Sequence, residues 1–156
     1  MAIQLKKVSN LETLALGFNY EGEINIKDDV PTGGAVDIQF NSAELVGTVG
    51  KVGLVVDQHV PADNSGSTDY TSYKVVVGDT ADPDGQIDDV ELCPAGTEAA
   101  IGTIFVNTGD DPFGTVVSNV GATFTSLNET DEALATAGKV RLFFEYYPTA
   151  GDNFSG

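Results

Sequence analysis

The chain has 156 residues, of which 24 are acidic and 7 are basic, so its formal net charge is -17. This length fits one domain that buries roughly two-thirds of the surface of its unfolded form. A surface this acidic repels phosphate backbones and anionic lipid headgroups. We therefore expect neither nucleic acid nor a membrane among the partners of this protein.

The single cysteine, Cys93, excludes an internal disulfide and has the setting of a small buried residue. Residues 1–8 contain no long apolar run after their two lysines and no cleavage site, so a secretory signal is not expected. No stretch approaches the ~20 apolar residues of a membrane span. We expect a protein that is made and folds in a cytoplasm.

Apolar and polar residues alternate along most of the chain, which is the pattern of β-strands with one buried face. In the first half the expected strands are residues 14–20, 24–26, 36–40, 45–49 and 52–57. A turn at Gly22 separates the first two strands, and Gly50-Lys51 joins the last two. The nearly continuous apolar run at 52–56 indicates a strand that is buried on both faces.

The second half continues the same pattern, with expected strands at residues 73–77, 90–93, 101–106, 120–124 and 139–148. Stretches rich in Gly, Pro and Asp predict loops or turns at residues 28–34, 61–68, 78–89 and 110–114. Residues 128–137 form the one plausible helix, with Asn128 as N-cap and acidic residues in the first turn.

Roughly nine or ten short strands with at most one short helix predict an all-β fold. The spacing of the strands favours a single-domain antiparallel β-sandwich or a jelly-roll-like arrangement. We expect residues 1–148 to form this domain, because no repeat or linker divides them. The small and polar residues 149–156 are expected to form a flexible C-terminal tail.

The last expected strand, residues 139–148, has the clearest pattern. The side chains expected to point into the core are Val140, Leu142, Phe144 and Tyr146. The opposite face is half polar, but it also carries Phe143 and Tyr147. These two side chains need cover, either from a neighbouring layer of the same chain or from another subunit.

The acidic stretch from Thr80 to Glu91 places oxygen ligands at spacings that resemble a calcium-binding loop. The candidate ligands are Asp82, Asp84, Asp88 and Glu91. Two features oppose a calcium site: the first ligand position holds Thr80, and the flanking segments are expected strands instead of helices. We favour a solvated β-turn built on Asp-Pro-Asp-Gly, and we expect no metal or other cofactor.

No grouping of residues in the sequence favours catalysis. Asp57 and His59 share a strand face and could orient a base for a serine or for Cys93. No serine, however, lies in the setting of an activated nucleophile. The chain also has no phosphate-binding glycine loop, zinc pattern or dinucleotide fingerprint. We expect a protein that is not an enzyme and has no catalytic residue.

Two short stretches of the chain have distinctive sequences. The first is Lys-Val-Val-Val-Gly-Asp at 74–79 followed by Asp-Pro-Asp-Gly at 82–85. The second is Thr-Ala-Gly-Lys-Val-Arg at 136–141 followed by Glu-Tyr at 145–146. Both resemble segments of small β-rich virion proteins of tailed bacteriophages. The resemblance covers roughly residues 45–148, and its motifs are short.

This resemblance implies a structural virion component, a head decoration or cement protein that binds assembled major capsid protein. It also implies a homo-oligomer, a trimer or a dimer. The net charge favours the outer capsid surface of the virion, because packaged DNA would repel the protein from the interior.

Residues that could contact a partner come from the N-terminus and from the last strand. We predict contacts by Ile3, Leu5, Lys6, Lys7, Phe143 and Tyr147. The lysine pair could dock on an acidic shell or could simply be solvated. The aromatic pair could instead lie under a neighbouring sheet of the same chain.

Two alternative functions stay open. The first is another β domain of a virion, such as a head fibre base, a collar or a tail-associated protein. The second is a carbohydrate- or receptor-binding module, with exposed tyrosines in place of the missing tryptophan. The tyrosines considered for this role are Tyr70, Tyr73, Tyr146 and Tyr147.

Overall fold

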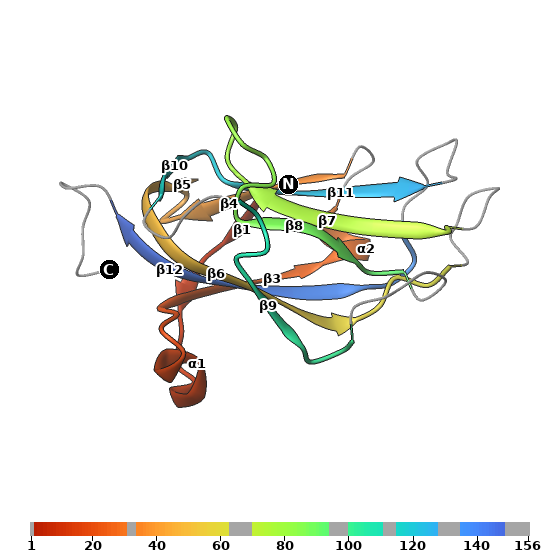
Figure 1. The fold of residues 1–156 in the computed structure, drawn as a ribbon, viewed down its shortest axis with the longest axis horizontal. Coiled ribbons are helices and arrows are strands. Elements are labelled where there is room, and N and C mark those ends of the chain that lie inside the picture. Colours follow the sequence, from red (N-terminus) through yellow and green to blue (C-terminus); the bar gives the residue numbers. More distant parts are fainter. Residues whose placement is uncertain are drawn as a thin grey trace.

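The computed structural model describes residues 2–30, 34–62, 70–93, 100–110, 115–127 and 135–148. Within these residues, strands form two six-stranded sheets that stack as layers (Figure 1). The prediction of an all-β sandwich is therefore confirmed. In the part of the chain that is described, no helix is long and apolar enough to cross a membrane.

Sheet A has the strand order β1-β4-β11-β7-β8, with β5 paired to β4. Its strands are β1 (Ala2–Gln4), β4 (Ala35–Phe40), β5 (Ala43–Glu44), β7 (Ser72–Gly78), β8 (Ile87–Glu91) and β11 (Gly121–Leu127). The β1–β4 pair is parallel and the other pairs of this sheet are antiparallel. The sandwich is thus antiparallel as predicted, except for one parallel pair at the edge of sheet A.

Sheet B has the strand order β10-β6-β12-β3-β2, with β9 also paired to β6, and all of its pairs are antiparallel. Its strands are β2 (Lys6–Lys7), β3 (Tyr20–Asn25), β6 (Val46–Gln58), β9 (Ile104–Val106), β10 (Thr115–Ser118) and β12 (Lys139–Pro148). Strand β12 lies between β6 and β3, at the centre of this sheet.

The main core lies between the two sheets. All four residues predicted to point inward from β12 are at most 2 % exposed, which confirms that prediction. Burial of each such large side chain stabilises the fold by about 1.5–3 kcal/mol. The one polar group among these four side chains, the Tyr146 hydroxyl, donates a hydrogen bond to the Val46 carbonyl oxygen at 2.8 Å.

Strand β6 was predicted as two strands joined at Gly50-Lys51, and this was wrong. A single strand of 13 residues runs through this point. Between Phe144 and Tyr146 of β12 the pairing shifts by one residue, so β6 has a β-bulge there. Glu145 Oε1 occupies the space that a side chain at Gly50 would need, and it accepts a bond from the Lys51 N–H at 3.0 Å. The glycine therefore permits a bulge instead of a turn.

The N-terminal prediction also needs correction. Strand β3 continues through Gly22, where a turn was expected. A Cβ atom at this position would lie 3.0 Å from Ile3 Cδ1 and 3.2 Å from Leu5 Cδ2. The glycine is therefore needed so that the N-terminal residues can pack closely over the strand.

Residues 14–20 were predicted as a strand, but the structure has helix α1 (Leu11–Ala15) followed by a short connection to β3. The alternation of Leu14, Leu16 and Phe18 was misleading because both leucines point to solvent. A second short helix, α2 (Ile26–Asp29), follows β3 directly. The described residues thus contain two short helices, where at most one was predicted.

The remaining elements agree with the predictions to different extents. Strands β4, β7 and β11 lie close to where they were expected, β8 begins three residues earlier than expected, and β9 is shorter. Strands β1, β2, β5 and β10 were not predicted, because two to four residues are too few to show a pattern. Residues 128–134 of the predicted helix and the predicted tail at 149–156 lie outside the described residues, and 135–137 are not helical.

We expect Leu142→Ala to lower the free energy of unfolding by about 2–5 kcal/mol, because it leaves a cavity under a fully buried side chain. Val116→Ala, at an exposed position of β10, is the control and should change it by less than about 0.5 kcal/mol. Urea unfolding followed by circular dichroism measures both. Equal losses in the two variants would contradict the assignment of the core.

Candidate interaction surface

The large exposed hydrophobic side chains of the described residues all belong to sheet B or to segments that lead into it. They are Leu11, Leu14, Leu16, Ile101, Val106, Val116 and Tyr147. Single exposed hydrophobic residues are ordinary on a protein surface, but their restriction to one of the two sheets makes the sheet B side of the sandwich the candidate interaction site. We call this side the sheet B surface.

Part of this surface is a row of side chains that cross three strands. Val116 of β10 and Tyr147 of β12 both pair with Thr48 of β6, so the three side chains point outward from the same face. Val116 is 73 % exposed and Tyr147 is 52 % exposed. The Tyr147 hydroxyl donates to Glu145 Oε2 at 3.1 Å, and this bond raises the pKa of the Tyr147 phenol.

Phe143 belongs to the same outward face, but it is only 3 % exposed. It forms a second, smaller core with Val8, Phe18 and Val55, and the Phe18 and Phe143 ring centroids are 5.7 Å apart. The cover that Phe143 needs therefore comes from residues 8–18 of the same chain.

The structure thus separates the six predicted contact residues into two groups. Ile3 and Leu5 lie in the main core, and Phe143 lies in the smaller core, so these three side chains are not available to a partner. This corrects the predicted contact set. Lys6, Lys7 and Tyr147 are exposed. Lys6 also lies 3.8 Å from Glu21, a surface ion pair of small energetic value.

Helix α1 lies on the side of sheet B that faces away from sheet A (Figure 1). None of its residues is buried. At its N-terminus Asn10 Oδ1 accepts bonds from the Glu12 and Thr13 N–H groups, at 2.9 and 3.2 Å. At its C-terminus Lys51 Nζ donates to the Leu16 carbonyl oxygen at 3.1 Å. The helix is therefore fixed at both ends although it adds nothing to the core.

Charge is distributed unevenly between the two sheets. The strands of sheet B and residues 8–19 together carry five basic and five acidic residues, so this side has no net formal charge. The strands of sheet A carry one basic and five acidic residues. Among the described strands, sheet A therefore carries a net negative charge and sheet B does not.

Two of the residues considered for catalysis, Asp57 and Cys93, have structural roles. Arg141 donates to both carboxylate oxygens of Asp57, at 2.6 and 3.0 Å, and its guanidinium lies 5.4 Å from the Phe143 ring centroid. The bond to Asp57 raises the pKa of Arg141. Cys93 is fully buried, with its Sγ atom 3.7 Å from the Tyr70 carbonyl oxygen. A buried thiol of this kind is packed as a small apolar side chain.

The calcium candidates do not form a metal cluster. Among the described residues, no group of three or more His, Cys, Asp or Glu side chains is placed to hold a metal ion. Glu91 instead accepts bonds from the Ser72 hydroxyl at 2.7 Å and the Tyr73 N–H at 3.2 Å.

The other three candidates lie in the turn between β7 and β8 or at the start of β8. Asp79 Oδ1 accepts bonds from the Ala81 and Asp82 N–H groups, which is the hydrogen bonding of an Asx turn. Partial loss of hydration and the neighbouring carboxylates raise the pKa of Asp88. Asp82 and Asp84 therefore occupy a turn, as the favoured interpretation of this stretch predicted.

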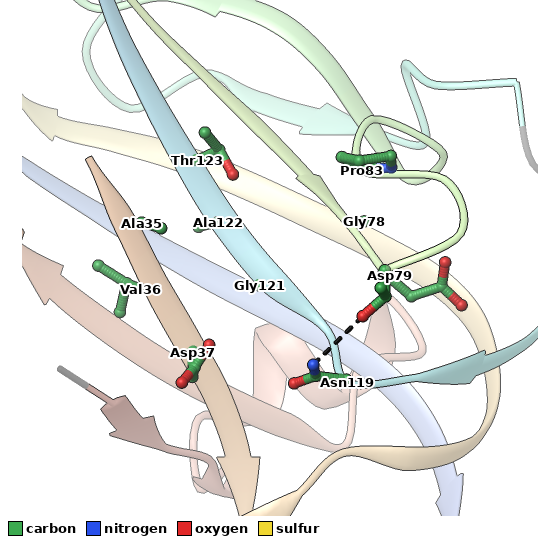
Figure 2. A pocket seen from close by; sticks show the side chains of 11 residues that line it. Ala35, Val36, Asp37, Gly78, Asp79, Pro83, Asn119, Gly121, Ala122 and Thr123 are labelled. Carbon is green, nitrogen blue, oxygen red and sulfur yellow. Dashed lines mark hydrogen bonds between the residues drawn. The ribbon is translucent and has the colours of Figure 1, made fainter. Parts of the chain in front are cut away.

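A hollow of about 210 Å³ lies on the outward face of sheet A, between β4, β11 and the turn after β7 (Figure 2). Its polar groups include Asp37, Asp79 and Asn119, and none of its described lining residues is aromatic. Asp79 Oδ2 accepts from the Ser118 N–H, and Asn119 Nδ2 donates to Thr80 Oγ1, both at 3.2 Å. These bonds hold the turn after β7 against the end of β10, so these polar groups have a structural role.

Carbohydrate stacking has little support from the four tyrosines considered for it. Tyr70, Tyr73 and Tyr146 are buried, and burial also raises the pKa of the Tyr73 phenol. Tyr147 alone of the four presents its ring to solvent. A single ring is a small platform, since sugar-binding sites commonly combine stacking with several polar groups.

We expect Phe143→Ala to lower the free energy of unfolding by about 3 kcal/mol, because the ring is covered by residues of its own chain. Tyr147→Ala should lower it by less than about 1 kcal/mol, because this ring is half exposed. Thermal unfolding of the isolated protein compares the two variants. A neutral Phe143→Ala variant would show that the smaller core adds nothing.

Comparisons with protein-family models, with curated proteins and with solved structures find no match to this chain. They therefore neither support nor oppose the resemblance to phage virion proteins. The description of the site therefore rests on its own geometry: a partly apolar sheet B surface without net charge, opposite an acidic sheet A.

Proposed function

We propose that this protein is a non-enzymatic structural component of a tailed-phage virion. In this proposal it is a decoration or cement protein that binds the major capsid protein on the outer surface of the assembled head. The supporting observation is the difference between the two faces of the sandwich. The exposed apolar side chains belong to sheet B and the segments next to it, whose charges balance, and the strands of sheet A carry five acidic residues against one basic residue.

A decoration protein needs one face for the shell and one for solvent. The apolar side chains of the sheet B surface lose little hydration in a contact, and its balanced charges do not repel a partner of either sign. The acidic strands of sheet A would lose hydration without compensation in a contact, so they favour the solvent side. Negative charge also keeps the protein outside a DNA-filled head.

Stabilisation by such a protein follows from binding to the assembled state alone. A ligand that binds the assembled shell and not its free subunits shifts the equilibrium toward the shell. Many copies of a modest contact, each bridging neighbouring capsid subunits, add their binding energies. A closed dimer or trimer of this protein would match the symmetry axes of such a lattice.

The proposal is tested by adding the purified protein to heads that lack it and locating it by electron microscopy. We expect density on the outer surface of the heads and a higher temperature of DNA release. Density at the collar or tail would support the alternative virion location. Absence of binding to any part of the particle would contradict a virion role.

The face that binds can be identified with matched variants. Val116→Ser with Tyr147→Ser should weaken binding to the heads by about tenfold or more, because both side chains lie on the sheet B surface. Val76→Ser, on β7 of sheet A, is the control and should bind like the unchanged protein. Co-sedimentation measures all three, and a loss confined to Val76→Ser would reverse the proposed orientation.

A further inference from the structure

We infer that α1 is a preformed anchor that inserts its leucine side chains into an apolar, uncharged pocket of a partner protein. The inference rests on the proposed function, in which the partner is the capsid subunit. It goes further by naming the element that makes the central contact and the chemistry of the pocket that receives it.

Helix α1 would not form without support from the rest of the chain. It has five residues, and isolated helices shorter than about 12 residues are marginal in water. Support comes from the Asn10 cap, from Lys51 at the C-terminal end, and from Val8 and Phe18, which anchor both flanks in the smaller core. The fold therefore presents this helix in one defined place.

The side chains that this support presents are apolar. Leu11 is 81 % exposed, Leu14 is 43 % exposed and Leu16 is 53 % exposed. Leu11 and Leu14 are three residues apart, so they lie on one side of the helix. A short helix with apolar residues at this spacing is the form in which helical segments enter grooves of other proteins. Because the helix is already ordered, little ordering entropy remains to be lost on binding.

Charge decides what kind of pocket fits. Glu12 is the one charged residue of α1, and Lys51 lies at the other end of the helix. Because the charges of the sheet B strands and residues 8–19 balance, a pocket without net charge meets no net repulsion there. Binding should therefore depend weakly on salt, although the chain as a whole has a net charge of -17.

A protein pocket fits these observations better than a second copy or a membrane. The hollow in Figure 2 has carboxylates of Asp37 and Asp79 in its lining, so it does not suit leucine side chains of another copy. The net charge of -17 opposes the approach of the chain to an anionic membrane.

The test compares Leu11→Ser/Leu14→Ser with Ile101→Ser, a matched control that removes an exposed apolar side chain outside α1. Circular dichroism first establishes that both variants are folded. In co-sedimentation with heads lacking the protein, the double variant should bind at least about tenfold more weakly and the control about as tightly as the unchanged protein. Affinity of the unchanged protein should vary less than about threefold between ~0.05 and ~0.5 M NaCl.

A second variant tests preorganisation without removing an apolar atom from α1. Lys51→Met removes the bond from Nζ to the Leu16 carbonyl oxygen and should weaken binding several-fold. Retention on octyl-agarose is the readout that does not need heads. The unchanged protein should be retained longer than the Leu11→Ser/Leu14→Ser variant, whatever the identity of the partner.

The outcomes separate the two proposals. If the unchanged protein does not bind heads but the octyl-agarose difference is found, the virion function fails and the apolar anchor stands. Equal retention of the two proteins, or equal binding to heads, overturns the anchor. A steep loss of affinity with salt overturns the uncharged pocket.

Two further results would show that α1 binds something other than a protein pocket. If light scattering finds a dimer that the double variant does not form, α1 binds a second copy of this chain. If the unchanged protein binds phosphatidylcholine vesicles, α1 binds a lipid surface.

Discussion

The fold depends on the pairing of β12 with β6 on one side and with β3 on the other. This pairing places the buried side chains of the three strands next to one another on the inner face of sheet B. The inner face of sheet A packs against them and completes the core. The bulge at Gly50 is part of the same arrangement. Successive residues of a strand point to opposite faces, so a shift of one residue moves a side chain to the other face. The extra residue in β6 allows Val49 and its partner Tyr146 both to point into the core; without it Val49 would point outward.

The outward face of β12 determines where apolar surface is left for a partner. Residues 8–18 cross this face, and Val8 and Phe18 close the smaller core over Phe143. The same segment holds α1 outside that core, where its leucines meet solvent. Asn19 then returns the chain to the sheet through two bonds between its side-chain amide and the backbone of Tyr146, at 2.9 and 3.0 Å. One short segment therefore completes the fold and presents the surface.

The electrostatic asymmetry gives this surface an orientation. The basic residues that oppose the overall negative charge are concentrated on sheet B, where ion pairs such as Arg141–Asp57 hold them in place. A bidentate pair of this kind is directional, so it keeps the arginine on the sheet. An acidic face and a neutral face on opposite sides of a thin sandwich favour attachment by one side, which is the property that the proposed role on a shell requires.

Local sequence patterns were enough to predict the fold class, the inward-facing residues of β12 and the buried run at 52–56, because alternation and apolar runs are local signals. It could not show that Gly22 permits close packing, that Gly50 permits a bulge, or that Leu14 and Leu16 lie outside the core. Only the tertiary structure decided that Phe143 is covered by its own chain and that Val116 and Tyr147 share a face. Those facts depend on the register between strands far apart in the chain, and a pattern within one strand carries no information about its neighbour.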